Sequence, residues 1–181
     1  MKTLTLLRHA KSTWDDPVAR DFDRPLNPRG RRAARTIGRE MRSLGMRFDA
    51  VIASPAVRVK ETLAEVEASF GAALSPSFDK RVYLAPASTL LDLVHEANDG
   101  AETLLIVGHN PGLEQLAMML GGQDGTDGAR AALARKYPTA TIAEIVLEVD
   151  RWSDVGEGGG MLTRFIRPRD LDPELGPDED S

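Results

Sequence analysis

The sequence of 181 residues contains no cysteine, which excludes a disulfide framework, thiolate catalysis and metal sites with cysteine ligands. It also has no apolar run long enough to span a membrane and no charged-then-apolar leader, so we expect neither secretion nor membrane insertion. The cytoplasm is the expected location. A chain of this length buries roughly 70% of its unfolded surface, which suits one domain with a proper core.

The excess of acidic residues is confined to the C-terminus. The chain has 28 Asp and Glu against 23 Lys and Arg, and residues 171–181 contain five of the acids and no base. Without this segment the two signs are equal, so nothing indicates a nucleic-acid partner. The acids, prolines and glycine near the end predict a domain over 1–169 and an acidic, disordered tail over 170–181.

Short apolar runs alternate with amphipathic segments along most of the chain. Strands are expected at 4–7, 49–53 and 103–107, and each precedes a capping residue, a proline and a helix. Two later strands, around 145–149 and at 161–166, are joined by a glycine-rich loop typical of a hairpin. We therefore predict an α/β three-layer sandwich with a mostly parallel sheet, an antiparallel edge hairpin and helices on both faces.

Shorter and less regular patterns predict features outside these main strands and helices. We expect a short strand within 75–85, a helix capped by Ser88 in which His95 faces solvent, and a mobile connection over 123–137. Trp14, in a polar loop, is interpreted as a local packing anchor rather than a substrate contact. The helix after Pro28 carries six arginines, which form either a solvated face or a docking face for an acidic partner.

Four residues near the ends of the predicted strands indicate one site. Arg8 and His9 follow the first strand, Arg58 lies near the start of the helix after the second, and His109 follows the third. Because the carboxyl ends of parallel strands share one rim, we expect these side chains to meet. Alone, each could be a capping histidine or a surface arginine. Two permanent cations, two imidazoles and three helix N-termini together favour a phosphoryl site.

The motifs that contain these residues resemble those of the histidine phosphatase superfamily, which includes phosphoglycerate mutase. Residues 7–10 resemble its R-H-G/A signature, 54–58 with Thr62 its second arginine motif, and 107–111 its second histidine motif. More narrowly, four segments are similar to the SixA-like phosphohistidine phosphatases: 8–14, 24–30, 108–114 and 138–140. The resemblance covers about residues 3–149 and implies a phosphoglycerate mutase-like fold.

The resemblance also implies a mechanism and a substrate class. His9 would attack a phosphoryl group and form a phosphohistidine that water hydrolyses, while Arg8, Arg58 and His109 hold its oxygens. Lys11 and Ser12 are further candidates for phosphate binding. The implied partner is a phosphorylated protein, such as a His-phosphorylated phosphotransfer domain in signal transduction, or a small phosphorylated substrate, with no nucleic acid and no membrane.

No cofactor or metal ion is expected. A metal site built from His and Asp is the competing chemistry, but the charges of Arg8 and Arg58 would oppose a cation there. Asp15 stands where some branches of the family carry an asparagine. A carboxylate at that position would repel a phosphate dianion, so Asp15 is left out of the predicted site.

The sequence departs from the branches that act on sugar phosphates, because residues 83–88 contain no carboxylate that could serve as general acid. Asp79 is the nearest candidate. An imidazole leaving group, with a pKa of about 6.5, needs less help than an alkoxide, so the departure favours phosphoramidates. Three functions stay open: a phosphohistidine phosphatase, a phosphatase of small phosphomonoesters or anhydrides, and a non-catalytic phospho-binding module. Retention of His9 argues against the third, because any cation would suffice for binding.

Overall fold

A seven-stranded sheet with strand order β3-β2-β4-β1-β6-β7-β5 organises the computed structural model, which describes residues 1–14 and 20–176. The strands are β1 (Lys2–Arg8), β2 (Ala50–Ala53), β3 (Ser77–Phe78), β4 (Thr103–Gly108), β5 (Gly121–Asp124), β6 (Ile142–Leu147) and β7 (Gly160–Ile166). The helices are α1 (Pro28–Ser43), α2 (Val57–Phe70), α3 (Ala87–Glu96), α4 (Gly112–Leu120), α5 (Ala129–Arg135) and α6 (Pro168–Leu171). Within the described residues, no helix has the length and apolar character needed to cross a membrane.

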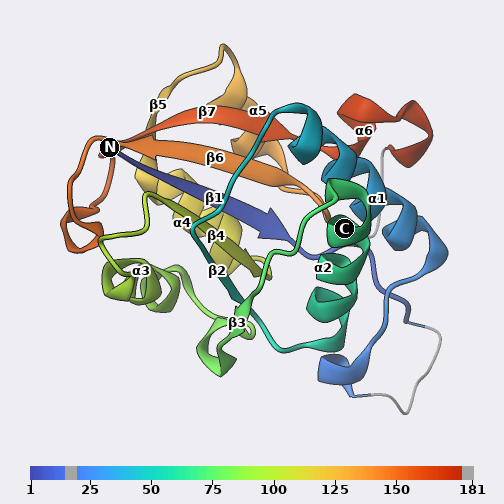
Figure 1. The fold of residues 1–181 in the computed structure, drawn as a ribbon. Coiled ribbons are helices and arrows are strands. Elements are labelled where there is room, and N and C mark those ends of the chain that lie inside the picture. Colours follow the sequence, from blue (N-terminus) through green and yellow to red (C-terminus); the bar gives the residue numbers. More distant parts are fainter. Residues whose placement is uncertain (15–19, 177–181) are drawn as a thin grey trace.

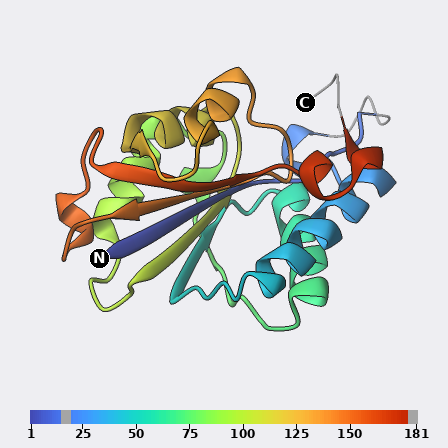
Figure 2. The same cartoon turned by 90° about the horizontal axis from the view of Figure 1, so that it is seen from above.

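Helices cover both faces of the sheet, which confirms the predicted three-layer α/β sandwich (Figures 1 and 2). Successive side chains of a strand point to opposite faces. In β1, Leu4 and Leu6 are therefore buried with residues of α3, α4 and α5, whereas Leu7 is buried with residues of α1 and α2. Burial on both faces explains why β1 and β4 are apolar almost throughout.

The sheet is mostly parallel, and β6 runs antiparallel to its neighbours β1 and β7. The predicted antiparallel pairing of the last two strands is thus confirmed, but the pair does not form the edge. β5 lies beyond β7 and pairs with it in parallel. The sequence prediction of a mobile connection over 123–137 missed this strand, because Gly121, Gly122 and two polar residues carry no strand pattern and the pairing with β7 alone defines it.

The capping residues expected at the starts of the helices have different outcomes. The side chain of Asn27 accepts a hydrogen bond from the backbone of Gly30 and caps α1, as predicted. The predictions for Ser54 and Ser88 are wrong. Helix α2 begins only at Val57, because the buried Ser54 hydroxyl binds elsewhere, and Ser88 lies inside α3.

Two predictions for 75–96 have different outcomes. The short strand occurs, as β3 around Phe78, where it pairs with β2. His95 is half-buried rather than solvated, because its Nε2 donates a hydrogen bond to the carbonyl oxygen of Val155 at 2.7 Å. That contact joins α3 to the connection between β6 and β7, two segments that the sequence does not relate.

The C-terminal segment folds further than the acidic composition predicts. Residues 173–175 form a 3-10 turn after α6, and Leu175 is buried in the core beside α1. The carboxylates of Asp172 and Glu174 bind Arg32 of α1 at 2.6 and 2.7 Å. The expectation of a disordered tail over 170–181 is therefore wrong for 170–176, where ion pairs and one apolar anchor offset the cost of ordering. Residues 177–181 lie outside the described residues.

Candidate active site

Arg8, His9, Arg58 and His109 lie together at the carboxyl ends of the central strands. β1 and β4 are neighbours in register, with Arg8 paired to Gly108, and the N–H of His9 donates to the carbonyl of Gly108 at 3.0 Å. The two histidines therefore leave the sheet side by side, with ring centroids 5.2 Å apart. Arg58 approaches from the start of α2, and all four side chains line one pocket. We call it the catalytic pocket.

The orientation of the His9 ring is fixed by the backbone carbonyl of the next residue, Ala10. Nδ1 lies 2.7 Å from the carbonyl oxygen of Ala10, and a carbonyl only accepts, so Nδ1 carries the proton. Nε2 then keeps its lone pair, toward which the Nε–H of Arg58 points at 3.4 Å. The ring is buried, with 7% of its surface exposed. The arrangement presents an unprotonated nitrogen, which is what a nucleophile requires.

Arg58 connects the two histidines. Its guanidinium is 2% exposed, and its Nη2 donates to Nδ1 of His109 at 3.2 Å. The Thr62 hydroxyl, one turn along α2, donates to the carbonyl of Arg58 and accepts from the N–H of Ala10 at 2.9 Å. This hydroxyl ties the helix that carries Arg58 to the loop that carries His9, and so fixes the distance between them.

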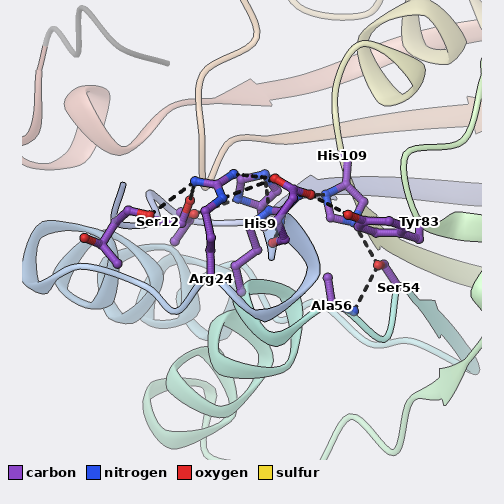
Figure 3. A network of polar contacts seen from close by, with 11 residues as sticks. His9, Ser12, Arg24, Ser54, Ala56, Tyr83 and His109 are labelled. Atoms are coloured by element: carbon purple, nitrogen blue, oxygen red, sulfur yellow. Dashed lines mark hydrogen bonds and ion pairs between the residues drawn. The ribbon is translucent and has the colours of Figure 1, made fainter. Parts of the chain in front are cut away.

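His109 is held on its other side by Ser54. Nδ1 accepts from Arg58, so Nε2 carries the proton and donates to the Ser54 hydroxyl oxygen at 2.8 Å. The same oxygen accepts from the N–H of Ala56 at 3.2 Å (Figure 3). Ser54 thus orients an imidazole that comes from a different strand, which explains why it does not cap α2.

Both imidazoles are neutral at neutral pH. Burial, followed by the charge of Arg8, holds the pKa of His9 well below its usual value of 6.5. Burial, followed by the charge of Arg58, lowers the pKa of His109 to about 3. Removal from water disfavours a charged ring, and two fixed guanidinium charges disfavour it further. The pocket therefore combines permanent cations with neutral nitrogen ligands.

Asp21 is a site residue that the sequence analysis missed. Its Oδ2 accepts from Arg58 Nη2 at 3.1 Å and from the Tyr83 hydroxyl, and its Oδ1 accepts from Arg24 Nη2 at 3.0 Å. Burial works to raise the pKa of Asp21, but hydrogen bonds from Tyr83 and both guanidiniums outweigh it and lower this pKa to about 2. An ionised carboxylate therefore neutralises part of the cationic pocket.

The remaining candidates surround this centre. Arg8 lines the pocket and donates from Nη1 to the carbonyl of Tyr137 at 3.0 Å. Lys11 and Ser12, predicted as phosphate contacts, line it as well, and the Ser12 hydroxyl accepts from Arg24 Nη1 at 2.6 Å. Arg24 is buried and belonged to a recognised motif, although its approach to the site follows only from the folded loop.

Trp14 differs from its predicted role. It is 70% exposed, stacks on the Arg24 guanidinium 3.4 Å from the ring centroid, and lines the mouth of the pocket. The predicted local packing is therefore limited, among the described residues, to this stacking on Arg24, and most of the ring is exposed. Trp14 can touch a ligand that enters the pocket.

Asp79 cannot serve as the general acid of this pocket. It caps a 3-10 turn and binds Arg81 at 2.9 Å, and it does not line the pocket. The hydrogen bond and charge of Arg81 lower the pKa of Asp79, so it is a poor proton donor. Asp15 lies outside the described residues. Among 1–14 and 20–176, no three His, Asp or Glu side chains are grouped as metal ligands.

Comparisons with known proteins show the family to which the chain belongs. The sequence model of the histidine phosphatase superfamily (branch 1) matches residues 4–82. An uncharacterized protein of Mycobacterium tuberculosis is 38% identical over 164 residues, which cover 90% of this chain and 100% of that protein.

Two solved structures are similar along nearly their whole length. A SixA protein from Nakamurella multipartitia, named as a candidate phosphohistidine phosphatase, has 30% identity and a TM-score of 0.79 and covers 92% of this chain and 96% of its own. A SixA protein from Agrobacterium tumefaciens, named in the same way, has 29% identity and a TM-score of 0.75 and covers 92% and 98%. The chain belongs to the histidine phosphatase superfamily and is SixA-like.

Proposed function

We propose that this phosphatase transfers a phosphoryl group to Nε2 of His9 and then to water, and that its natural substrate is phosphohistidine on another protein. The observation that carries the proposal is the state of the His9 ring. Its Nδ1 proton is engaged by Ala10, and its Nε2 lone pair faces the buried guanidinium of Arg58. The nucleophile is thus unprotonated and lies beside a cation that attracts the phosphoryl oxygens.

The rest of the pocket supplies the charge that phosphoryl transfer needs. Arg8, Arg58 and His109 would hold the equatorial oxygens, with Lys11 and Ser12 at the periphery. In the first step the substrate N–P bond breaks, the His9 Nε2–P bond forms, and the departing imidazole takes a proton from solvent. Water then attacks phosphorus, which releases inorganic phosphate and restores His9. Two fixed cations stabilise the developing charge, and they would oppose a metal ion at the same place.

The proton balance of the pocket favours phosphohistidine. The only carboxylate among its described lining residues is Asp21, whose pKa of about 2 leaves it ionised and unable to donate a proton near pH 7. An alkoxide leaves poorly without a proton donor, whereas an imidazole leaving group is readily protonated by the solvent near neutral pH, because its conjugate acid has a pKa of about 6.5. The two SixA neighbours are named as candidate phosphohistidine phosphatases, which is the same substrate class. A His-phosphorylated phosphotransfer domain of a cytoplasmic signalling system fits this proposal.

Trapping the covalent intermediate tests the nucleophile. The protein is incubated with a ³²P-labelled phosphohistidine protein and the reaction is quenched in base. Acid-labile label is then measured on the phosphatase chain after its separation from the substrate protein. We expect label in the wild type and in His95→Ala, a matched control on α3 outside the pocket, and none in His9→Ala. Label that persists in His9→Ala would refute the assignment.

The substrate class needs a separate measurement. We expect kcat/KM on a phosphohistidine protein to exceed the values on an aryl phosphate and on a sugar phosphate measured under the same conditions. A faster reaction on the sugar phosphate would favour the phosphomonoesterase alternative. Binding of the phosphorylated protein with neither covalent label nor turnover would favour the binding module.

A further inference from the structure

A second cavity opens beside the catalytic pocket, and we call it the basic pocket. It shares the lining residues Lys11 and Thr139 with the catalytic pocket, so the two cavities are adjacent. Its other charged lining residues are all basic: Arg29, Lys136, Arg167 and Arg169. Among the residues that the structure describes, no carboxylate lines it.

The walls of the basic pocket are rigid because they belong to packed elements. Arg29 lies in the first turn of α1, and Arg169 lies in α6, which packs beside α1 at the end of the sheet where β1 stops (Figure 2). The loop after β1 is pressed onto α1 at Gly30, where an added Cβ would lie 2.1 Å from the carbonyl oxygen of Lys11. The backbone segments that carry the cations are therefore already packed together without a ligand.

Three of the six arginines of α1 are already neutralised within the protein. Arg31 and Arg35 both bind the Glu65 carboxylate, at 3.3 and 2.9 Å. Arg32 binds Asp172 at 2.6 Å. The arginine-rich face of α1 was expected to be either solvated or a docking surface. Internal ion pairs occupy three of its arginines.

The end of α1 at the basic pocket is different. Arg29 and Arg169 form no ion pair with any described residue, whereas Arg167 binds Asp170 at 2.8 Å. Like charges held near one another in a partly enclosed cavity repel, and an anion that enters relieves this repulsion. Within 1–14 and 20–176, the basic pocket therefore holds two arginines whose charge no carboxylate neutralises.

We propose that the basic pocket docks an acidic segment of the phosphorylated protein, with its carboxylates on Arg29 and Arg169 while the phosphohistidine occupies the catalytic pocket. The inference rests on the proposed function. The lining also includes four apolar residues, Ala33, Pro138, Pro168 and Leu175. These side chains can pack against the methylene stems of glutamate but offer no hydrogen bonds to a free phosphate, so they favour a peptide.

Two phosphohistidine peptides test the proposal. They are identical except that one carries three glutamates beside the phosphohistidine and the other carries glutamines. We expect the wild type to prefer the glutamate peptide by roughly tenfold in kcat/KM, mainly through KM, the size expected when two partly exposed ion pairs contribute. The double variant Arg29→Glu/Arg169→Glu should lose this preference yet hydrolyse free phosphohistidine at the wild-type rate.

Arg47→Glu is the matched control, because it reverses an exposed charge just before β2, at the opposite rim of the sheet. It should retain the preference. A double variant with Gln in place of Glu should give an intermediate result and guards against misfolding. An unchanged preference in the double variants, no preference in the wild type, or an equal loss in Arg47→Glu would overturn the proposal.

A binding measurement separates this proposal from the proposed function. The unphosphorylated glutamate peptide, labelled with a fluorophore, should bind the wild type in a salt-dependent manner and bind the double variant at least tenfold more weakly. Charge-dependent binding without any hydrolysis would count against the phosphatase assignment and support docking. Hydrolysis with no charge-dependent binding would support the phosphatase and refute docking.

Discussion

Replacing Asp21 with asparagine should weaken the fold and strengthen anion binding at the same time. The Asp21 carboxylate binds Arg58 and Arg24 and has its pKa lowered from 3.8 to about 2. This displacement corresponds to about 2.5 kcal/mol at about 1.4 kcal/mol per pKa unit. Because the side chain is 39% exposed, solvent screening reduces the expected loss of unfolding free energy to about 1 kcal/mol.

The pH dependence follows from the direction of the shift. A carboxyl group whose pKa is lower in the folded than in the unfolded protein stabilises the fold fully above its unfolded pKa. For Asp21 the contribution is therefore complete above about pH 4 and is lost as the pH falls toward about 2. Urea unfolding of wild type and Asp21→Asn should differ by about 1 kcal/mol at pH 7, and the difference should shrink across this window.

Anion binding supplies the opposing readout. The ionised carboxylate competes with a phosphoryl group for Arg58, so its removal should tighten inhibition by inorganic phosphate roughly tenfold, the effect of one charge contact. Asp23→Asn is the control, because Asp23 lies in the same 3-10 turn and binds Arg20 at the surface. Equal or weaker phosphate binding by Asp21→Asn, at any stability, would refute this reasoning.

Two further predictions concern the imidazoles and the loop after β1. Because burial and the neighbouring guanidiniums lower the pKa of His9 and His109, NMR should show neither ring protonating near pH 6.5, and their contribution to stability should decline as the pH falls below 6.5; titration of either ring at 6.5 would contradict it. Gly30→Ala places a Cβ 2.1 Å from the backbone oxygen of Lys11, so urea unfolding should show a loss of roughly 1–3 kcal/mol. Gly156→Ala, with no atom within 4 Å of the added Cβ, should change little, and equal effects of the two would refute the steric argument.

Much of the catalytic pocket could be predicted because its residues follow strands directly. A strand that ends at Arg8 or Gly108 delivers the next side chain to a fixed rim, and the sheet register alone brings His9 beside His109. Arg58 reaches the same rim because it lies at the start of α2, the helix that follows β2. These positions depend on chain order and strand direction, which the apolar runs encode.

Asp21 and Tyr83 could not be predicted in the same way. Asp21 lies in a polar loop without periodicity, and its three partners are 3, 37 and 62 residues away along the chain. Nothing local distinguishes it from Asp23, which points to the surface. The Ser54 hydroxyl is similar, because its sequence context is that of a helix cap and its partner is His109, on another strand.

The sequence by itself determined the alternation of strands and helices, the caps of α1, and the group of residues at the ends of β1, β2 and β4. The spacing of apolar residues, the capping side chains and the strand direction depend on interactions within a few residues, so the sequence is enough to predict them. Only the tertiary structure decided that β5 forms the sheet edge, that Leu175 anchors the C-terminal segment and that Asp21 enters the pocket. Each of these depends on a partner distant in sequence, and such a contact is stable only once the surrounding fold has brought the two surfaces together.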